Sequence, residues 1–301
     1  MNKQQIVEKI TELKIKRKAI IMAHLYEPDD IQEIADFTGD SLELSRRAAQ
    51  TDAETIVFCG VKFMAETAKI LSPKKTVLQP SPEAGCFLAD TINEYDVVKL
   101  KTENPAAVVV CYVNSSAAVK AESDYCCTSS NAVDLIKRIP EQEVIFIPDG
   151  NLGKNVAAQT PDKKFIFWNG YCDVHDMITV KDVDTARALN PKTEILVHPE
   201  CRPEVVAKID FVGSTAQILE YVKNSSKNNF VIGTEMGILF RLKKENPQKS
   251  FTLIKDGLYC RDMKKVGLRE IYDTLNEMKY ETIIAPEIQQ KAAVAINRML
   301  T

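Results

Sequence analysis

Short apolar runs alternate with amphipathic stretches along most of this chain. Runs such as Val108-Val109-Val110 and Ile56-Val57-Phe58 are not interrupted by polar residues, which is typical of parallel strands covered on both faces. Between such runs, apolar residues recur at helical spacing, as at Ile6, Ile10 and Leu13. Strands and helices that alternate over short loops predict an α/β fold with right-handed crossovers.

The first part of the chain gives the element order that the pattern predicts. The expected elements are a helix over 2–16, a strand over 19–24, a helix over 29–35, a strand over 36–38, a helix over 41–50, a strand over 55–59, a helix over 62–71 and a strand over 75–79. The same order recurs over 91–172 and 180–260. The tail over 266–300 reads as helical, with Pro286 at the start of the last helix.

Four sets of landmarks share one period. His24, Tyr112 and His198 stand 88 and 86 residues apart at the ends of predicted strands, and Asp36, Asp124 and Asp210 repeat the same steps. Gly60, Pro148 and Thr234 repeat them again, and Cys86, Cys172 and Cys260 follow with steps of 86 and 88.

The period predicts three equivalent α/β repeats, each a small parallel sheet flanked by helices, arranged with pseudo-threefold symmetry around a central site. The predicted boundaries are 1–88, 89–174 and 175–265. The helices over 266–301 are expected to pack on the first repeat.

Composition narrows the class of protein. A net charge of −3 over 301 residues gives no electrostatic basis for binding nucleic acid or an anionic membrane. Residues 1–18 form a charged helical stretch rather than a signal peptide, and no apolar run reaches the ~18 residues of a membrane span. We therefore expect a soluble, cytoplasmic protein. Its eight cysteines are expected to be free thiols, most of them packing residues like Cys59 and Cys111.

The candidate chemistry lies at the strand ends, because open parallel sheets bind ligands beyond the carboxyl ends of their strands. His24, Tyr112 and His198 stand there, and Tyr26, Asn114 and Glu200 follow two positions later. A lone histidine at a strand end is more often structural. All three histidines of this chain, His175 included, adjoin landmark positions, which favours a functional role.

Hydroxyl residues are predicted to begin helices near the same strand ends. Ser41, Ser129, Ser214 and Thr215 would place a hydroxyl and the positive end of a helix dipole beside a phosphate or carboxylate. The alternative is an ordinary helix cap, which is favoured for Ser41 alone.

The three repeated cysteines do not have the paired spacing of a structural zinc site. Three thiolates from distant positions suit an iron–sulfur cluster with one iron that has no protein ligand. An open iron can bind and polarise a substrate oxygen, which points to catalysis rather than electron transfer.

The motifs also resemble one enzyme family, quinolinate synthase, over essentially the whole chain. The residues that carry the resemblance are AHLYEPDDIQEIADFTGDS, GVKFMAETAKIL, CYVNSSAAVKAE, CTSSNAV, PDGNLG, NGYCDVH, VHPEC, VGSTAQ and IGTEMG. The family has three pseudo-equivalent α/β domains around a [4Fe–4S] cluster that three cysteines hold. It condenses iminoaspartate with dihydroxyacetone phosphate to quinolinate, with loss of phosphate and water, in the de novo route to NAD.

The resemblance implies roles for the residues that match its motifs. It implies one [4Fe–4S] cluster per chain and a partner that supplies iminoaspartate, either L-aspartate oxidase or aspartate dehydrogenase. The cluster ligands would be Cys86, Cys172 and Cys260; the catalytic residues His24, Tyr26, Tyr112, His198 and Glu200; and the substrate-binding residues Ser41, Asn114, Ser129, His175, Ser214 and Thr215.

The chain departs from the family pattern at three positions. Leu25 replaces the usual Asn or Tyr, and Glu27 replaces the usual Gln; both changes are expected to alter the pocket wall. Gly150 replaces a long polar residue in the PDxNLG motif. Cys260 is followed by Arg261, Asp262 and Met263, so the CxxCxxC switch of some members cannot form.

Two other functions are open on the residues alone. One is an aconitase-like hydro-lyase that uses the same cluster without a phosphate site. The other is a cluster-based sensor of oxygen or iron, which would be expected to carry a basic or DNA-binding segment that this sequence does not show.

Overall fold

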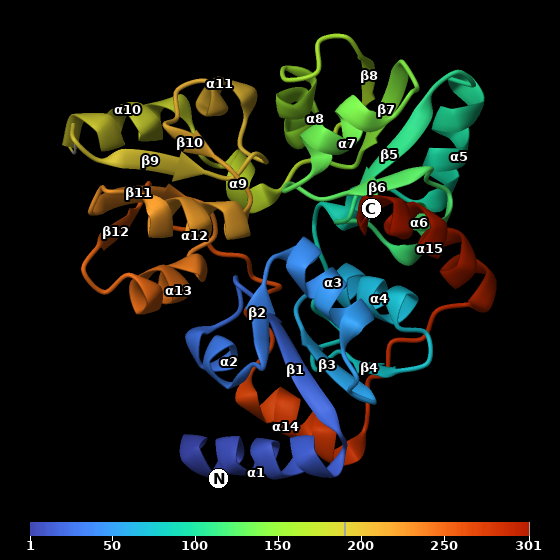
Figure 1. Ribbon diagram of the computed structural model, residues 1–301, viewed down its shortest axis with the longest axis vertical. Helices are drawn as coiled ribbons and strands as arrows, with labels where there is room; N and C mark the ends of the chain where they lie inside the picture. Colours follow the sequence, from blue (N-terminus) through green and yellow to red (C-terminus); the bar gives the residue numbers. More distant parts are fainter. Residues whose placement is uncertain (190, 301) are drawn as a thin grey trace.

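Three parallel four-stranded sheets, one per predicted repeat, form this computed structural model, which describes residues 1–189 and 191–300. Their strand orders are β2-β1-β3-β4, β6-β5-β7-β8 and β10-β9-β11-β12, so each sheet has the same topology. Figure 1 shows the three units as lobes around a common centre. The α/β fold of three repeats is therefore confirmed.

The first repeat follows the predicted element order closely. Its elements are α1 (Lys3–Lys16), β1 (Ala19–His24), α2 (Asp29–Ile34), β2 (Phe37–Gly39), α3 (Ser41–Gln50), β3 (Thr55–Cys59), α4 (Lys62–Leu71) and β4 (Thr76–Leu78). Predicted and observed ends differ by one residue at most for these elements, because the apolar runs coincide with strands that are buried on both faces.

The second repeat has the same order after a short 3-10 turn. Its elements are η1 (Ala89–Thr91), α5 (Glu94–Glu103), β5 (Val108–Tyr112), α6 (Ala117–Ala121), β6 (Tyr125–Cys127), α7 (Ala132–Arg138), β7 (Glu143–Ile147), α8 (Gly150–Ala157) and β8 (Lys164–Phe167).

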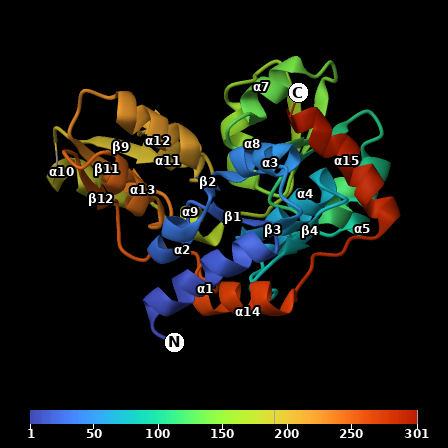
Figure 2. The same cartoon turned by 60° about the horizontal axis from the view of Figure 1, so that its bottom comes forward.

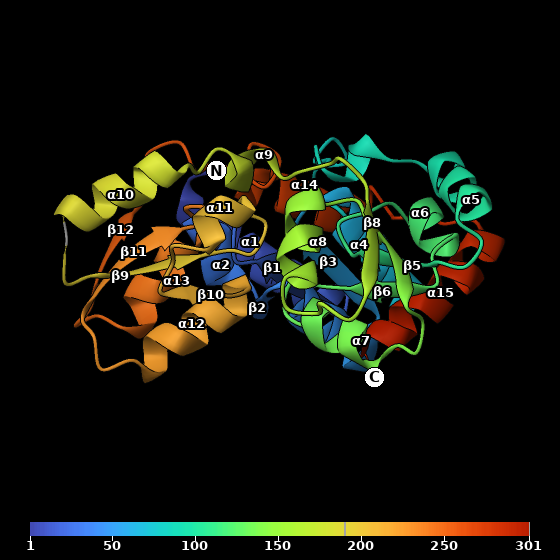
Figure 3. The same ribbon diagram turned by 90° about the horizontal axis from the view of Figure 1, so that it is seen from above.

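A short helix, α9 (Asp173–Asp176), lies between the second and third sheets and crosses the predicted boundary at 174/175 (Figure 3). The elements of the third repeat that follow it are α10 (Val180–Leu189), β9 (Glu194–Val197), α11 (Pro203–Val206), β10 (Phe211–Val212), α12 (Thr215–Asn224), β11 (Asn229–Gly233), α13 (Ile238–Glu245) and β12 (Ser250–Leu253).

The repeated aspartates have one structural role in all three sheets. Asp36, Asp124 and Asp210 each precede the edge strand, and each carboxylate accepts a backbone N–H from the neighbouring strand, at 2.7, 2.8 and 2.8 Å respectively. A charged acceptor on a backbone N–H fixes the register of the two strands. This common bond accounts for the aspartates recurring with the period of the repeat.

Two further helices, α14 (Leu268–Glu277) and α15 (Pro286–Leu300), complete the described chain. Helix α14 lies beside α1 of the first repeat, as Figure 2 shows. Helix α15 differs from the expectation, because it packs mainly against α6 and β6 of the second repeat and reaches the first repeat through α4. Its buried face includes Ala292 and Ala295, whose small side chains allow a close approach, and the Asn131 amide donates to the Met299 carbonyl at 2.9 Å. Residue 301 lies outside the described residues.

No helix in the described part of the chain is long and apolar enough to cross a membrane.

Candidate active site

A cavity of about 140 Å³ lies where the carboxyl ends of the three sheets meet. Thirteen of the fourteen site residues predicted from the sequence line this cavity. They are His24, Tyr26, Ser41, Cys86, Tyr112, Asn114, Ser129, Cys172, His175, His198, Glu200, Thr215 and Cys260. Residues separated by up to 236 positions thus share one site, as parallel sheets with a common orientation require.

His24 ends β1 and is buried among residues of the first and third repeats. Its Nδ1 accepts the backbone N–H of Tyr26 at 3.1 Å, which requires a lone pair on that nitrogen. Burial lowers the pKa of His24 to about 4, so its imidazole is neutral near pH 7. A neutral His24 therefore presents Nε2–H as its donor.

Glu200 lies between two histidines, all three of them almost fully buried. Its Oε2 is 2.7 Å from His175 Nδ1 and 3.1 Å from His198 Nδ1, and the two imidazole rings stack with centroids 4.6 Å apart. Burial opposes ionisation of Glu200, but His198 and His175 outweigh it and hold the pKa of this carboxyl below its ordinary value. Glu200 is therefore a carboxylate, and its second oxygen has no hydrogen-bond partner among the described residues.

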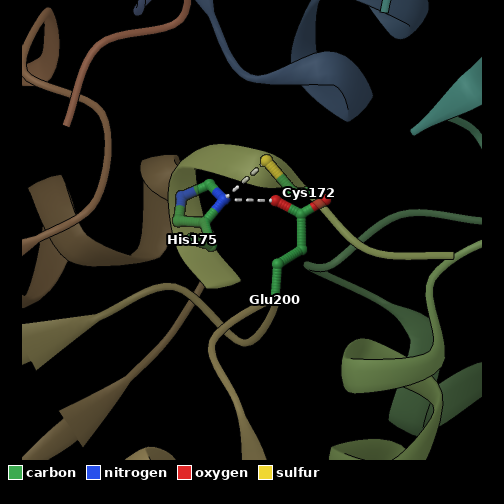
Figure 4. A group of neighbouring side chains, drawn as sticks. All are labelled: Cys172, His175 and Glu200. Atoms are coloured by element: carbon green, nitrogen blue, oxygen red, sulfur yellow. Dashed lines mark hydrogen bonds and ion pairs between the residues drawn. The ribbon is translucent and has the colours of Figure 1, made fainter. Parts of the chain in front are cut away.

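Cys172, His175 and Glu200 form a compact group of three different ligand types, drawn in Figure 4. His175 Nδ1 is 3.2 Å from Cys172 Sγ and 2.7 Å from Glu200 Oε2. Two nitrogen or oxygen ligands at about 2.05 Å from a tetrahedral metal would lie roughly 3.3 Å apart. The shorter contact is that of a hydrogen bond, so the group is arranged as a hydrogen-bonded triad.

A chain of hydroxyl groups leads from the third repeat to this triad. Thr215 Oγ1 donates to the Tyr26 hydroxyl at 3.0 Å, and the Tyr26 hydroxyl lies 2.6 Å from Thr234 Oγ1. Thr234 Oγ1 is in turn 2.8 Å from His175 Nε2. If Thr215 donates to Tyr26, Tyr26 to Thr234 and Thr234 to His175 Nε2, then the Nδ1–H of His175 donates to Glu200. Every group in this chain then has a donor or an acceptor for each of these bonds.

Tyr112 and Asn114 face the cavity from the second repeat. Burial, and then the charge of Glu200, raises the pKa of the Tyr112 phenol well above its ordinary value, so this group is a proton donor. Asn114 Oδ1 is buried and has no partner among the residues that the structure describes. A buried acceptor without a partner is costly, which makes it a candidate contact for a ligand.

Three of the four predicted hydroxyl residues do stand at helix starts. Ser214 is the capping residue of α12 and Thr215 its first residue, and Ser41 is the first residue of α3. The expectation that Ser41 is itself a helix cap is wrong, because Asp40 caps α3. The prediction that Ser129 begins a helix is wrong, because α7 starts at Ala132. Asn131 Oδ1 accepts the Thr128 backbone N–H at 2.8 Å and holds a turn there instead. The Ser129 hydroxyl still reaches His198 Nε2 at 3.1 Å.

The structure does not bring Ser214 into the cavity lining. Its hydroxyl donates to Asp40 Oδ2 at 3.1 Å and lies 2.8 Å from the Ser130 hydroxyl, which also donates to Asp40 Oδ2 at 2.8 Å. Asp40, Ser130 and Ser214 come from three different repeats. They form a polar junction between the three repeats, in which Asp40 also lines the cavity.

The three repeated cysteines are half-buried thiols that line the cavity. Burial raises the pKa of Cys86, Cys172 and Cys260, the last to about 11, and the charge of Cys260 raises the pKa of the other two. The other five cysteines are fully buried packing residues, namely Cys59, Cys111, Cys126, Cys127 and Cys201, as expected. A bound metal stabilises thiolates that burial disfavours, so these three thiols lining one cavity could hold a metal cluster.

The polar residues that the sequence prediction missed include three with clear partners or equivalents in the repeats. Asp40 and Glu235 line the cavity, and Thr234 joins Tyr26 to His175. The period could have found them, because Asp40 and Ser214 occupy equivalent positions and Glu235 directly follows the landmark Thr234.

The departures from the family pattern lie outside the cavity. Leu25, Glu27 and Gly150 are buried, and none of them is among its lining residues. A Cβ at Gly150 would lie 2.7 Å from the Trp168 carbonyl oxygen, so a larger residue there would require the backbone of 168–170 to move. The close approach of these two segments explains the glycine.

Comparison with known proteins gives one consistent similarity. The family described as Quinolinate synthetase A protein matches residues 8–301. A quinolinate synthase of Alkaliphilus metalliredigens is 50% identical over 300 residues, covering 100% of this chain and 99% of the relative. Quinolinate synthases of Dehalococcoides mccartyi and Clostridioides difficile are 49% and 47% identical, over 100% and 98% of this chain and 99% and 97% of the relatives.

Proposed function

Because this chain belongs to the Quinolinate synthetase A protein family, we propose that it condenses iminoaspartate with dihydroxyacetone phosphate to quinolinate, phosphate and water. The observation that carries this proposal is the common cavity. It combines three thiols, one from each repeat, with a buried carboxylate, two tyrosines and three histidines. Condensation followed by dehydration and ring closure needs a Lewis acid and several proton donors and acceptors at one place.

We propose that Cys86, Cys172 and Cys260 hold one [4Fe–4S] cluster. The donor set fits, since the three half-buried thiols line the same cavity and burial disfavours their thiolates unless a cation lies near them. When bound, a cluster with three protein ligands supplies one open iron that can polarise a substrate hydroxyl or carboxylate.

Glu200 is the proposed proton acceptor of the imine–enamine steps. Its free Oε1 lies on a carboxylate that His175 and His198 keep ionised, so it can take a proton from a substrate carbon or nitrogen. His198 also touches Ser129, through which it can orient a substrate oxygen. Glu200 is thus the base, and the histidines hold it in position.

Tyr26 and Tyr112 are the proposed proton donors or hydroxyl-orienting groups. Burial raises the pKa of both phenols, which keeps them protonated, and the Tyr26 hydroxyl is fixed between Thr215 and Thr234. A fixed O–H can donate to a leaving hydroxyl without reorganisation. His24 lines the same cavity and is a further hydrogen-bond donor, through the Nε2–H of its neutral imidazole.

The proposed substrate anchors are Ser41, Ser129, Thr215 and Asn114. Ser41 and Thr215 stand at the N-termini of ten-residue helices, where backbone N–H groups and the helix dipole favour a phosphate or carboxylate. Ser214 caps the helix that Thr215 begins, and its hydrogen bond to Asp40 holds this helix start in place.

The deciding experiment is anaerobic purification with an assay of iron and sulfide, followed by incubation with both substrates. The wild-type chain should bind four irons and form quinolinate, and Cys86→Ala should lose both. Cys127→Ala is the matched control, since Cys127 is buried in the second sheet and is not among the residues that line the cavity. Iron without quinolinate would favour a hydro-lyase instead. A folded anaerobic chain without iron would refute the cluster.

Three wider proposals accompany this function. We propose a cytoplasmic location, and a partner of the L-aspartate oxidase or aspartate dehydrogenase type that supplies iminoaspartate. We also propose repeat boundaries at 1–88, 89–174 and 175–265, each enclosing one sheet. Co-purification with the supplying enzyme would test the partner.

A further inference from the structure

A buried ion pair within the third repeat lies at the cavity wall and contacts the first repeat through the backbone of Tyr26. Glu235 is the second residue beyond the end of β11 and is fully buried, with Oε1 2.9 Å from Lys264 Nζ. The Lys264 side chain is only 11% exposed and follows Cys260 by four residues. Burying two full charges carries a solvation cost that the pair must offset through well-directed contacts.

The contacts of this pair reach both a cluster cysteine and a catalytic tyrosine. Glu235 Oε1 accepts the backbone N–H of Cys260 at 3.1 Å, and Oε2 accepts that of Gly237 at 2.6 Å. Lys264 Nζ donates to the backbone carbonyl of Tyr26. A Cβ at Gly237 would lie 2.8 Å from Tyr26 Cα, so the two repeats are in direct contact here.

We propose that Glu235 and Lys264 are positioning residues that fix Cys260 relative to Tyr26 across the boundary between the first and third repeats. The inference rests on the proposed function, which makes Cys260 a cluster ligand and Tyr26 an active-site residue. Neither Glu235 nor Lys264 needs to touch the substrate for this role. Three hydrogen bonds and one ion pair define the separation between the loop that carries Tyr26 and the loop that carries Cys260.

The nearby acid Glu27 is not an equivalent partner for Lys264. Both Glu27 oxygens are buried without a hydrogen-bond partner among the described residues, whereas Glu235 Oε1 is in contact with Lys264 Nζ. Burial raises the pKa of Glu27 well above its ordinary value, and its carboxyl has no hydrogen bond of the kind that Glu235 makes with Lys264.

The repeats support a specific role for Glu235. The equivalent residue of the second repeat is Asp149, a fully buried carboxyl that lies by the backbone N–H of Cys172. The equivalent residue of the first repeat is Val61, which has no acceptor. A carboxyl therefore lies beside the backbone N–H of the repeated cysteine in the second and third repeats, but not in the first.

Two double variants separate the acceptor from the charges. Glu235→Gln with Lys264→Met keeps an oxygen for the Cys260 N–H, whereas Glu235→Ala with Lys264→Met does not, and both remove the two charges together. The holoenzyme is prepared anaerobically and exposed to a chelator while the visible absorbance of the cluster is followed. We expect the Ala/Met variant to release iron about tenfold faster than the Gln/Met variant, the effect of losing one hydrogen bond.

The matched control is Asp210→Ala in the same repeat. Asp210 also accepts a backbone N–H, that of Ile195 at 2.8 Å, and pairs with Arg187 at 2.8 Å, but it lies at the edge strand away from the cavity. This variant should release iron at the wild-type rate. If the Ala/Met variant does not fold, Glu235→Asn with Lys264→Met replaces it, because the shorter side chain withdraws the acceptor.

A second readout reports on Tyr26. Both double variants lack the Lys264 contact to the Tyr26 carbonyl, so each should show kcat per bound cluster lowered about tenfold. Iron release and kcat per cluster both at wild-type values would overturn the inference while leaving the proposed function intact. A wild-type chain that binds no iron would overturn the proposed function, and the inference with it.

Discussion

His24 makes the stability of this chain depend on pH in a defined window. Burial lowers its pKa from the ordinary 6.5 to about 4, and its Nδ1 accepts a backbone N–H that would clash electrostatically with a protonated ring. Between these two values the unfolded chain binds a proton at His24 and the folded chain does not. Stability must therefore fall as the pH drops from about 6.5 to about 4.

The size of the effect follows from the two pKa values. Between pH 7 and pH 4.5, His24 alone should lower the free energy of unfolding by about 2.4 kcal/mol, at 1.36 kcal/mol per pKa unit. Below about pH 4 both states bind the proton, and this contribution stops growing.

The assay compares the wild-type chain with His24→Asn, whose side-chain oxygen can accept the Tyr26 N–H. Urea unfolding of the iron-free chain at a series of pH values gives the slope of unfolding free energy against pH for each. Near pH 5 the free energy of unfolding of the wild-type chain should change by about 1.36 kcal/mol per pH unit more than that of the variant, which corresponds to the uptake of about one proton on unfolding. Equal slopes would refute the argument, since the pH dependence would then arise from other groups.

Three other substitutions test the site and its supports. Glu200→Gln should lower kcat by about 10²–10⁴-fold, the range for loss of a general base, with four irons retained; loss of iron instead would show that Glu200 acts mainly on the cluster. Gly170→Ala would place a Cβ 2.4 Å from the Pro148 carbonyl oxygen and should destabilise the chain by about 1–3 kcal/mol in thermal unfolding. Gly85→Ala, whose nearest contact would be 3.5 Å, serves as its control, and equal stability of the two would contradict the steric argument. Asp40→Ala removes the cap of α3 and two hydroxyl bonds, so we expect a loss of about 2–3 kcal/mol; Asp40→Asn, which keeps an acceptor, should recover part of it.

The repeats could be predicted because each unit carries the same local constraints. Asp36, Asp124 and Asp210 recur since each accepts the N–H of a neighbouring strand, and the apolar strands recur since each is covered on both faces. The strand-end positions of His24, Tyr112 and His198 then placed them near one site.

Other features depended on contacts between repeats, which a local pattern does not report. Ser214 would suit an anion site by its position, but Asp40 and Ser130 from the other repeats engage its hydroxyl. Helix α15 was expected on the first repeat, yet its small buried residues fit the groove of α6 and β6.

The sequence by itself determined the α/β class, the threefold repeat and the candidate site residues, because periodic burial and strand-end placement are properties of each repeat alone. Only the tertiary structure decided the hydrogen bonds of Tyr26 with Thr234 and of His175 with Glu200, and the role of Glu235 and Lys264 between repeats. These interactions join residues that are distant in sequence, and their energies depend on distances and burial that exist only once the repeats have packed together.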